Sequence, residues 1–181
     1  MKKESKAVLI ERLETEIDRQ INIVVDQFQN LSDDQLNQPG ENGGWSIARN
    51  LQHLNLYFEY YNPAIRKALE KSKVDPNAGG FVSGWLGNYF TNSMDYRTGK
   101  KVKAFKDYIP EERLDSAKVI QEFIQHEEDF LQLIRESRSF NLSKIKVAIS
   151  LTKWIKMRLG DVFQFVTMHN ERHLVQAQSR L

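Results

Sequence analysis

Two histidines near the end of the chain have a spacing that suits metal binding. They are His169 and His173, four residues apart in a segment with helical periodicity. Residues four apart on a helix lie on one face, so both imidazoles can bind one cation at about 2.0–2.1 Å. The same spacing also arises by chance on many helix surfaces, and by itself it indicates a metal site only weakly.

The position of this pair on its helix strengthens the interpretation. At about 100° per residue, His173 falls within an apolar stripe and His169 at its edge; the stripe contains Leu159, Val162, Phe163, Val166 and Ala177. Both rings should therefore point inward, where an unpaired polar group costs about 1–3 kcal/mol. A metal ion would satisfy both imidazoles, and hydrogen bonds to side chains or water would do so equally well. The residues alone leave these interpretations balanced.

The remaining two histidines are His53 and His126. His53 lies away from the apolar stripe of its predicted helix, on a face with Tyr57 and Tyr60. A single histidine there is usually a surface residue, although a face with aromatic residues could line a cleft. His126 flanks an apolar face beside Glu127, and we interpret it as a structural or surface residue.

A three-histidine site on two helices would leave coordination positions for water, which is typical of catalytic rather than structural metal sites. Water bound there would have a lowered pKa and could act as a nucleophile or base. Imidazole ligands suit zinc, nickel, copper or iron. The candidates for a general acid or base, by proximity in sequence, are Tyr57, Tyr60 and Glu171.

Composition narrows the class of protein. The 181 residues include no cysteine, which excludes disulfides, thiolate metal ligands and a cysteine nucleophile. Lys plus Arg number 26 and Asp plus Glu 24, a balance that argues against a nucleic-acid partner. We interpret the basic run Lys100, Lys101, Lys103 and Lys106 as a solvated loop. With no signal peptide and no apolar membrane span, a cytoplasmic protein without a membrane partner is expected.

Apolar residues at helical spacing predict four long helices, at about residues 5–28, 46–73, 116–137 and 160 to the C-terminus. Ser46 and Asp161 are the predicted helix caps, and Pro63 a point where a kink could form. Residues 74–115 and about 138–159 should be irregular, the former with one short helix. The prediction is an all-α four-helix bundle forming a single domain over residues 1–181.

The chain resembles the DinB-like superfamily, which includes bacillithiol-dependent transferases and mycothiol-dependent isomerases. Residues 44–54, GWSIARNLQHL, resemble the family's W-S-x-x-x-x-x-x-H-L segment, and residues 168–176, MHNERHLVQ, resemble its H-x-x-x-H-L-x-Q segment. The start of the last helix, residues 159–161, LGD, is also similar. The resemblance implies up-down-down-up topology with a long crossover between the second and third helices.

The same resemblance implies a divalent metal ion, with nickel or zinc favoured, bound by His53, His169 and His173. Gln176, one turn beyond the last of these, is either a supporting partner of the site or an exposed polar residue. Family members with a known substrate use low-molecular-weight thiols. Residues 74–115, which would shape the pocket, match nothing in the family pattern.

Three hypotheses for function follow. The first is an enzyme acting on a small-molecule substrate, in which water or a thiol cosubstrate attacks an electrophile, giving a hydrolase or a thiol-S-transferase. The second is a non-catalytic, stress-related bundle that binds a metal or small ligand. The third is a degenerate member with an empty site. A homodimer through the aromatic patch of residues 85–90 is a further expectation.

Overall fold

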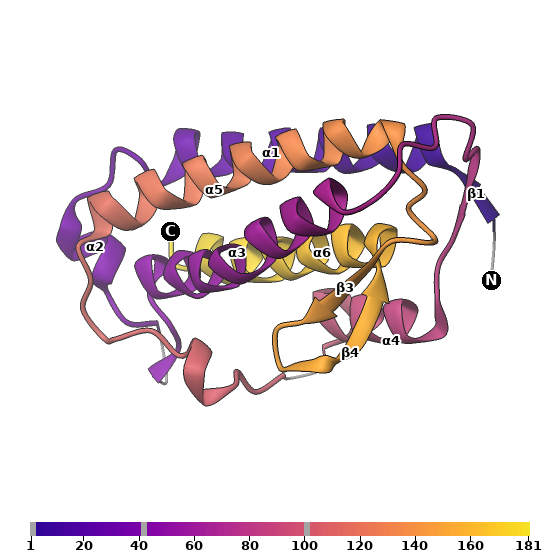
Figure 1. Cartoon of the computed structure of the whole chain (residues 1–181). Coiled ribbons are helices and arrows are strands. Elements are labelled where there is room, and N and C mark those ends of the chain that lie inside the picture. Colours follow the sequence, from indigo (N-terminus) through magenta and orange to yellow (C-terminus); the bar gives the residue numbers. More distant parts are fainter. Residues whose placement is uncertain (1–2, 41–42, 100–101) are drawn as a thin grey trace.

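The computed structural model describes residues 3–40, 43–99 and 102–181. Two residues of the predicted basic run, Lys100 and Lys101, lie outside the described residues, as do Met1 and Lys2 of the N-terminal segment. Over the described ranges the chain is mostly helical and carries two small sheets (Figure 1). The predicted helical class is therefore confirmed in its broad form, and the sheets are additions to it.

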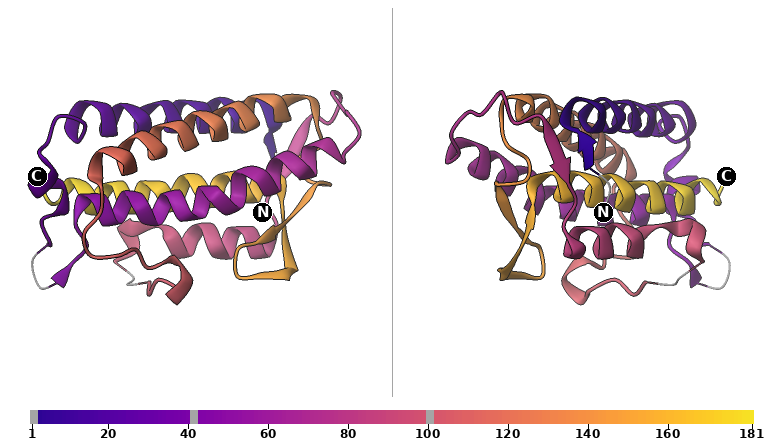
Figure 2. Two further views of the ribbon diagram at one scale, coloured as in Figure 1. Left: turned by 60° about the vertical axis from the view of Figure 1, so that its left-hand side comes forward. Right: turned by 90° about the vertical axis from the view of Figure 1, so that its right-hand side faces the viewer.

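Four long helices lie side by side: α1 (Lys6–Gln27), α3 (Ile47–Glu70), α5 (Ser116–Glu136) and α6 (Leu159–Gln178). Helices α3 and α1 each pack against both α5 and α6. Figures 1 and 2 show α3 and α5 running in one direction and α1 and α6 in the other. The pairing of α3 with α6 matters most for function, because these helices carry the candidate metal ligands.

The helix bounds follow the apolar periodicity closely. As predicted, the side chain of Ser46 caps α3 by accepting a hydrogen bond from the backbone N–H of Arg49. Helix α3 continues through Pro63. The prediction that Asp161 caps α6 is wrong, because the preceding strand leads directly into the helix and the N-cap is Arg158. Asp161 lies instead in the first turn of α6, where its carboxylate accepts a hydrogen bond from the backbone N–H of Gly84 (3.0 Å).

Two predicted loops contain regular structure. The strands β3 (Lys146–Ile149) and β4 (Thr152–Arg158) form an antiparallel hairpin with an irregularity after Ala148, where an irregular stretch was expected. Its alternating pattern over Ile145, Val147 and Ile149 has the period of a strand. A short helix, α2 (Asp33–Asn37), lies between the predicted helices at 5–28 and 46–73 and is stabilised by a capping box between Ser32 and Gln35.

The segment between α3 and α5 contains the predicted short helix, α4 (Trp85–Met94), which packs against α6. It also contains β2 (Gly80–Val82), which pairs antiparallel with β1 (Lys3–Ser5), and the 3₁₀ turns η2 (Tyr96–Thr98) and η3 (Lys106–Tyr108). A third turn, η4 (Ser137–Ser139), follows α5. Among the aromatic residues of this segment, Phe81 is buried, whereas Trp85 and Tyr89 are 76% and 63% exposed.

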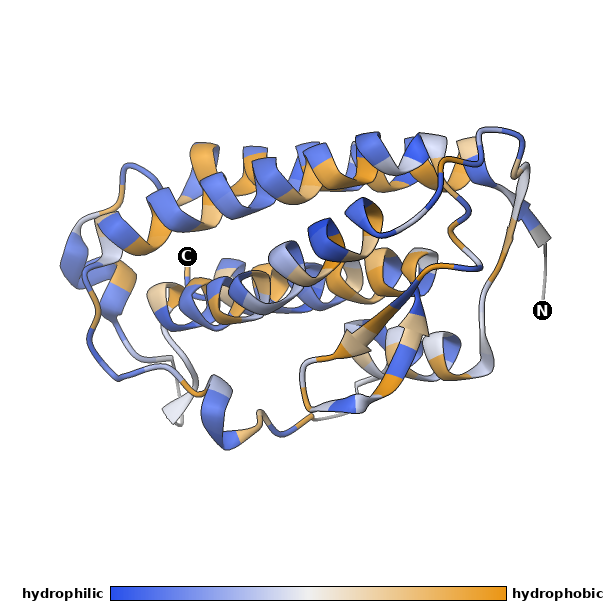
Figure 3. Cartoon of the chain, viewed as in Figure 1, coloured by the Kyte–Doolittle hydropathy of each residue, from blue (hydrophilic) through white to orange (hydrophobic). Residues whose placement is uncertain are grey.

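Apolar side chains fill the space between the helices. Figure 3 shows hydrophobic residues concentrated on the inward faces of the long helices, with polar residues on the outer faces. The largest buried side chains include Phe58, Phe123, Phe130 and Phe163, which lie on α3, α5 and α6. Among the described helices, none has both the length and the apolar character needed to cross a membrane.

Candidate metal centre

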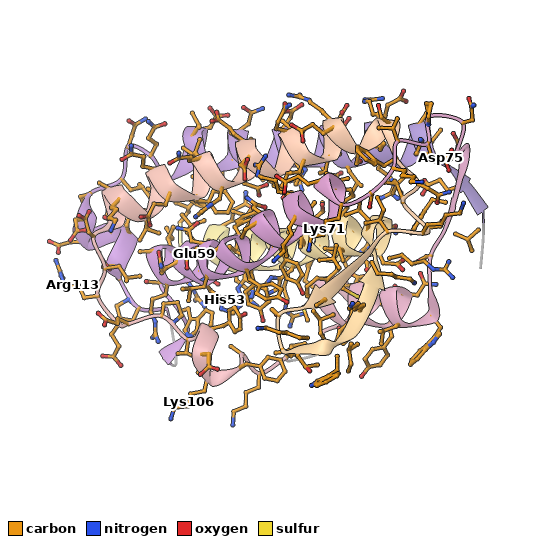
Figure 4. All side chains as sticks on the ribbon, viewed as in Figure 1. His53, Glu59, Lys71, Asp75, Lys106 and Arg113 are labelled. Atoms are coloured by element: carbon orange, nitrogen blue, oxygen red, sulfur yellow. The ribbon has the colours of Figure 1, made fainter. Side chains whose placement is uncertain are left out.

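Three histidines from α3 and α6 meet between those helices. His53, His169 and His173 each present one ring nitrogen, and these atoms all lie within 4.8 Å of one another. All three side chains are buried, with 2%, 4% and 8% exposure respectively. In Figure 4, His53 extends from α3 into the side chains between that helix and the η3 segment. The structure therefore brings together the three residues that the sequence identified from two distant stretches.

Two hydrogen bonds fix the direction in which the imidazoles face. Nδ1 of His53 lies 2.5 Å from the backbone oxygen of Tyr108, and Nδ1 of His173 lies 2.9 Å from the side-chain oxygen of Asn50. Because each oxygen accepts, each Nδ1 must carry the proton. The Nε2 atoms of both rings are then left with free lone pairs, which is the tautomer that binds metals.

The spacing of the nitrogens suits a common ion. Nε2 of His53 and Nε2 of His169 are 3.3 Å apart. Two nitrogens bound to one tetrahedral ion at about 2.0–2.1 Å would lie about 3.3 Å apart. A direct hydrogen bond between the two rings also fits this distance. Such a bond would not involve the third ring, that of His173, although its centre is only 4.5 Å from that of His53. The donor set and its spacing therefore fit a divalent ion.

Burial keeps these histidines neutral. It lowers the pKa of His53 to about 4, despite the opposing hydrogen bond to the backbone of Tyr108. Burial also lowers the pKa values of His169 and His173 far below the ordinary range, and neighbouring imidazoles and Arg172 lower them further. A neutral imidazole is the form that donates a lone pair to a metal, so the centre is ready to bind one at neutral pH.

A pocket of about 220 Å³ opens onto the three histidines. Its other walls are Trp45, Tyr57, Met94, Val102, Lys103, Ala104, Phe105, Arg172 and Gln176. Lys103 and Arg172 are cationic, and no aspartate or glutamate is among the described residues that line it. Burial raises the pKa of Tyr57 well above its ordinary value, so its phenol stays protonated and can donate a hydrogen bond but cannot act as a base. The described lining of the pocket is thus positively charged and contains no carboxylate that could act as a base.

The other residues that the sequence suggested as acid, base or supporting partner do not all lie at the histidine pocket. Tyr57 and Gln176 line the pocket, but Tyr60 donates its hydroxyl hydrogen bond to the backbone of Ile149, 3.0 Å away. Glu171 forms an ion pair with Arg19 beside a different cavity. Tyr60 and Glu171 are therefore not placed to act as acid or base for the histidine pocket.

His126 lies apart from the other three histidines. It is half-buried, and its ring stacks against Phe58 with the centroids 5.9 Å apart. This position agrees with a structural rather than a metal-binding residue.

Sequence reasoning missed three polar partners. Asn50 precedes His53 by three residues and so lies on a neighbouring part of the same helix face, a signal that was available. The Tyr108 backbone oxygen gives no sequence signal, because any residue supplies one. Glu127 gave no sequence signal of burial, because Glu128 and Asp129 follow it directly, yet it is fully buried.

Glu127 on α5 forms a second buried polar site with Asn170 on α6. Its Oε1 accepts a hydrogen bond from Nδ2 of Asn170 at 2.9 Å, and its Oε2 has no hydrogen-bond partner among the described residues. Burial raises the pKa of Glu127 well above its ordinary value, although the bond from Asn170 opposes this shift. Burial thus favours the neutral form of this carboxyl group.

Comparison with known proteins agrees with the motifs. The family model described as the DinB superfamily matches residues 16–177, which include all three clustered histidines. Searches of curated proteins and of solved structures found no significant match.

Proposed function

The chain belongs to the DinB superfamily, and we propose that it is a metal-dependent enzyme in which His53, His169 and His173 bind one divalent ion, nickel or zinc. We also interpret its four long helices as the up-down-down-up bundle that the family resemblance implies, with residues 71–115 as the long crossover. The observation that carries the proposal is the convergence of three buried, neutral imidazoles at the base of a pocket.

The chemistry of the donor set supports a catalytic role over a structural one. Three neutral protein ligands leave coordination positions for a small molecule. When bound, a divalent ion would act as a Lewis acid that lowers the pKa of a water or thiol ligand. The hydrogen bonds from His53 to Tyr108 and from His173 to Asn50 would hold the rings in place while a substrate enters.

The charge of the pocket favours an anionic cosubstrate. Arg172 and Lys103 add positive charge beside the three neutral histidines, and the described lining residues supply no acidic group to offset it. A low-molecular-weight thiol that carries a carboxylate would meet this charge with its acid group, and its sulfur would lose its proton to solvent because a bound ion lowers the thiol pKa. We therefore favour a thiol-S-transferase, in which the sulfur attacks an electrophilic carbon and displaces a leaving group.

A hydrolase finds less support in the same pocket. Hydrolysis generally uses a group that accepts a proton from water, and the described lining has no carboxylate for this role, while Tyr57 stays protonated. A thiol that has already lost its proton needs no such base. A non-catalytic protein that binds a metal or small ligand is the remaining alternative. Such a protein would also bind the ion at the three histidines, but it would show no turnover.

The deciding experiment is a conjugation assay with the zinc- or nickel-loaded protein. The probes are 3-mercaptopropionate and 2-mercaptoethanol, with 1-chloro-2,4-dinitrobenzene as the electrophile, so that a carbon–sulfur bond forms as chloride leaves. We expect metal-dependent conjugation that is faster with the anionic thiol, and loss of this preference in Arg172→Gln. Metal-dependent hydrolysis of p-nitrophenyl acetate without conjugation would identify a hydrolase, and binding of metal without either reaction would identify a non-catalytic protein.

A further inference from the structure

A small apolar cavity adjoins the histidine pocket. It has a volume of about 40 Å³ and shares the walls Tyr57, Met94 and Phe105 with the pocket. Its remaining walls include Tyr61, Phe90, Ile149, Leu151, Met157 and Phe165, and no charged side chain is among its described lining residues. The cavity thus shares part of its wall with the histidine pocket. Its described lining is uncharged, whereas that of the pocket is cationic.

The structure holds the wall of this cavity in place. The β3–β4 hairpin is tied to α3 by two hydrogen bonds: Tyr60 donates to the backbone oxygen of Ile149 at 3.0 Å, and the backbone N–H of Ser150 donates to the hydroxyl of Tyr61 at 3.2 Å. The hydroxyls of both tyrosines are therefore engaged with the hairpin. A wall fixed in this way needs little reorganisation when a ligand enters.

The cavity is also close to the reacting end of the pocket. Phe165 lies one helical turn before His169, and the two rings stack with an interplanar angle of 5° and centroids 5.8 Å apart. On its other side, Phe165 meets Phe90 edge to face at 6.0 Å. A short substituent on a molecule held at the histidines would therefore reach the cavity directly.

We propose that this cavity is a specificity subsite that takes a short, uncharged apolar group of the substrate, such as an alkyl chain of about three carbons. The inference rests on the proposed function, because it assigns the substrate of the same pocket. The cavity is lined mainly by aromatic and aliphatic side chains, with hydroxyls only from Tyr57, Tyr61 and Ser150 among the described lining residues. A ligand hydroxyl would exchange hydrogen bonds to water for this mainly apolar lining, whereas a methyl group would gain contacts with the walls. The substrate class is thus a molecule with a reactive centre at the histidines and an apolar arm under the hairpin.

Methionine methyl signals can test the cavity separately from the metal. Met94 and Met157 line it, whereas Met168 lines a different cavity on the other side of α6 and serves as an internal control. In metal-free protein labelled with ¹³C at the methionine methyls, xenon gas should shift the signals of Met94 and Met157, because xenon enters dry apolar cavities of this kind. Unshifted Met94 and Met157 signals would overturn the inference.

A matched pair of thiols tests the subsite in the zinc-loaded protein. 1-Propanethiol and 2-mercaptoethanol differ only in a terminal methyl or hydroxyl group. We expect 1-propanethiol to bind about tenfold tighter by calorimetry, because the methyl group is buried and no hydroxyl is left unpaired. Phe90→Trp should reduce this preference to about twofold by filling the cavity, whereas Tyr89→Trp, at the exposed neighbouring position, should retain it.

The outcomes separate this inference from the proposed function. Equal affinity for the two thiols in a zinc-loaded protein that binds both would overturn the subsite and leave the metal-dependent function standing. Failure to bind either thiol, with xenon still entering the cavity, would overturn the proposed function and with it the cavity's role in substrate binding.

Discussion

Helix α6 contributes buried polar groups to two sites, one shared with α3 and one shared with α5. Only the site shared with α3 lies beside the histidine pocket. On the side of α3, His169 and His173 join His53 around a common point beside a pocket of about 220 Å³. On the side of α5, Asn170 donates a hydrogen bond to Glu127, which is fully buried. Burial keeps the ionisable groups neutral at both sites, but only the histidines direct lone pairs at a shared space. Convergence beside a pocket, rather than burial alone, distinguishes the candidate functional site.

Removing one of the three clustered histidines should have the largest effect, and the effect should be on metal binding. Loss of His169 leaves two ligands, so His169→Ala should weaken zinc binding about a thousandfold or more and leave the purified protein without its ion. His126→Ala is the control, because that ring stacks on Phe58 outside the cluster. Elemental analysis measures both, and a His169→Ala protein that keeps one ion per chain would place the metal elsewhere.

Removing the buried carboxyl group should affect stability instead of metal binding. Glu127→Ala leaves the Asn170 amide unpaired and opens a cavity, so the free energy of unfolding should fall by about 2–4 kcal/mol. Glu127→Gln keeps the shape and the acceptor oxygen, and it should stay within about 1 kcal/mol of the wild-type value. Urea unfolding measures both. Loss of the metal from Glu127→Gln would instead show that Glu127 contributes to metal binding.

The two sites should respond to pH in opposite directions. The folded pKa of His53 is lowered to about 4, so its contribution to stability is complete above its ordinary pKa of 6.5 and is lost as the pH falls toward 4. The folded pKa of Glu127 is raised, so its contribution is complete below the ordinary value of 4.5 and is lost as the pH rises through the raised value.

Metal-free Glu127→Gln isolates the histidine contribution. From pH 7.5 to pH 5 it should lose about 2 kcal/mol of unfolding free energy through His53 alone, measured with urea. Adding His53→Gln should reduce the loss, whereas adding His126→Gln should not. A stability that is unchanged between these pH values would show that the clustered histidines are not held neutral.

The smallest effect should come from the residue that orients His173. Asn50→Ala removes the acceptor for its Nδ1 hydrogen and should weaken zinc binding about tenfold without removing it. Asn50→Asp keeps an acceptor oxygen and should restore most of the affinity. Competition with a chromophoric chelator measures these constants, and wild-type affinity in Asn50→Ala would exclude an orienting role.

The sequence predicted what depends on periodicity and residue type. The four long helices and the cap at Ser46 follow from apolar spacing and local residue type, and the meeting of the three histidines was implied by the resemblance to the DinB-like superfamily. The β3–β4 hairpin was missed because four or five alternating residues are too few to distinguish a strand from a loop. The burial of Glu127 was not predicted and Asp161 was assigned as a cap, since burial and pairing with a distant backbone depend on tertiary packing that local pattern does not contain.

X-ray absorption spectroscopy of the zinc-loaded protein tests the central claim most directly. The account predicts three imidazole nitrogens at about 2.0–2.1 Å from the ion, with one of them lost in His53→Ala. A first coordination shell without three imidazoles, or one that is identical in His53→Ala, would contradict it.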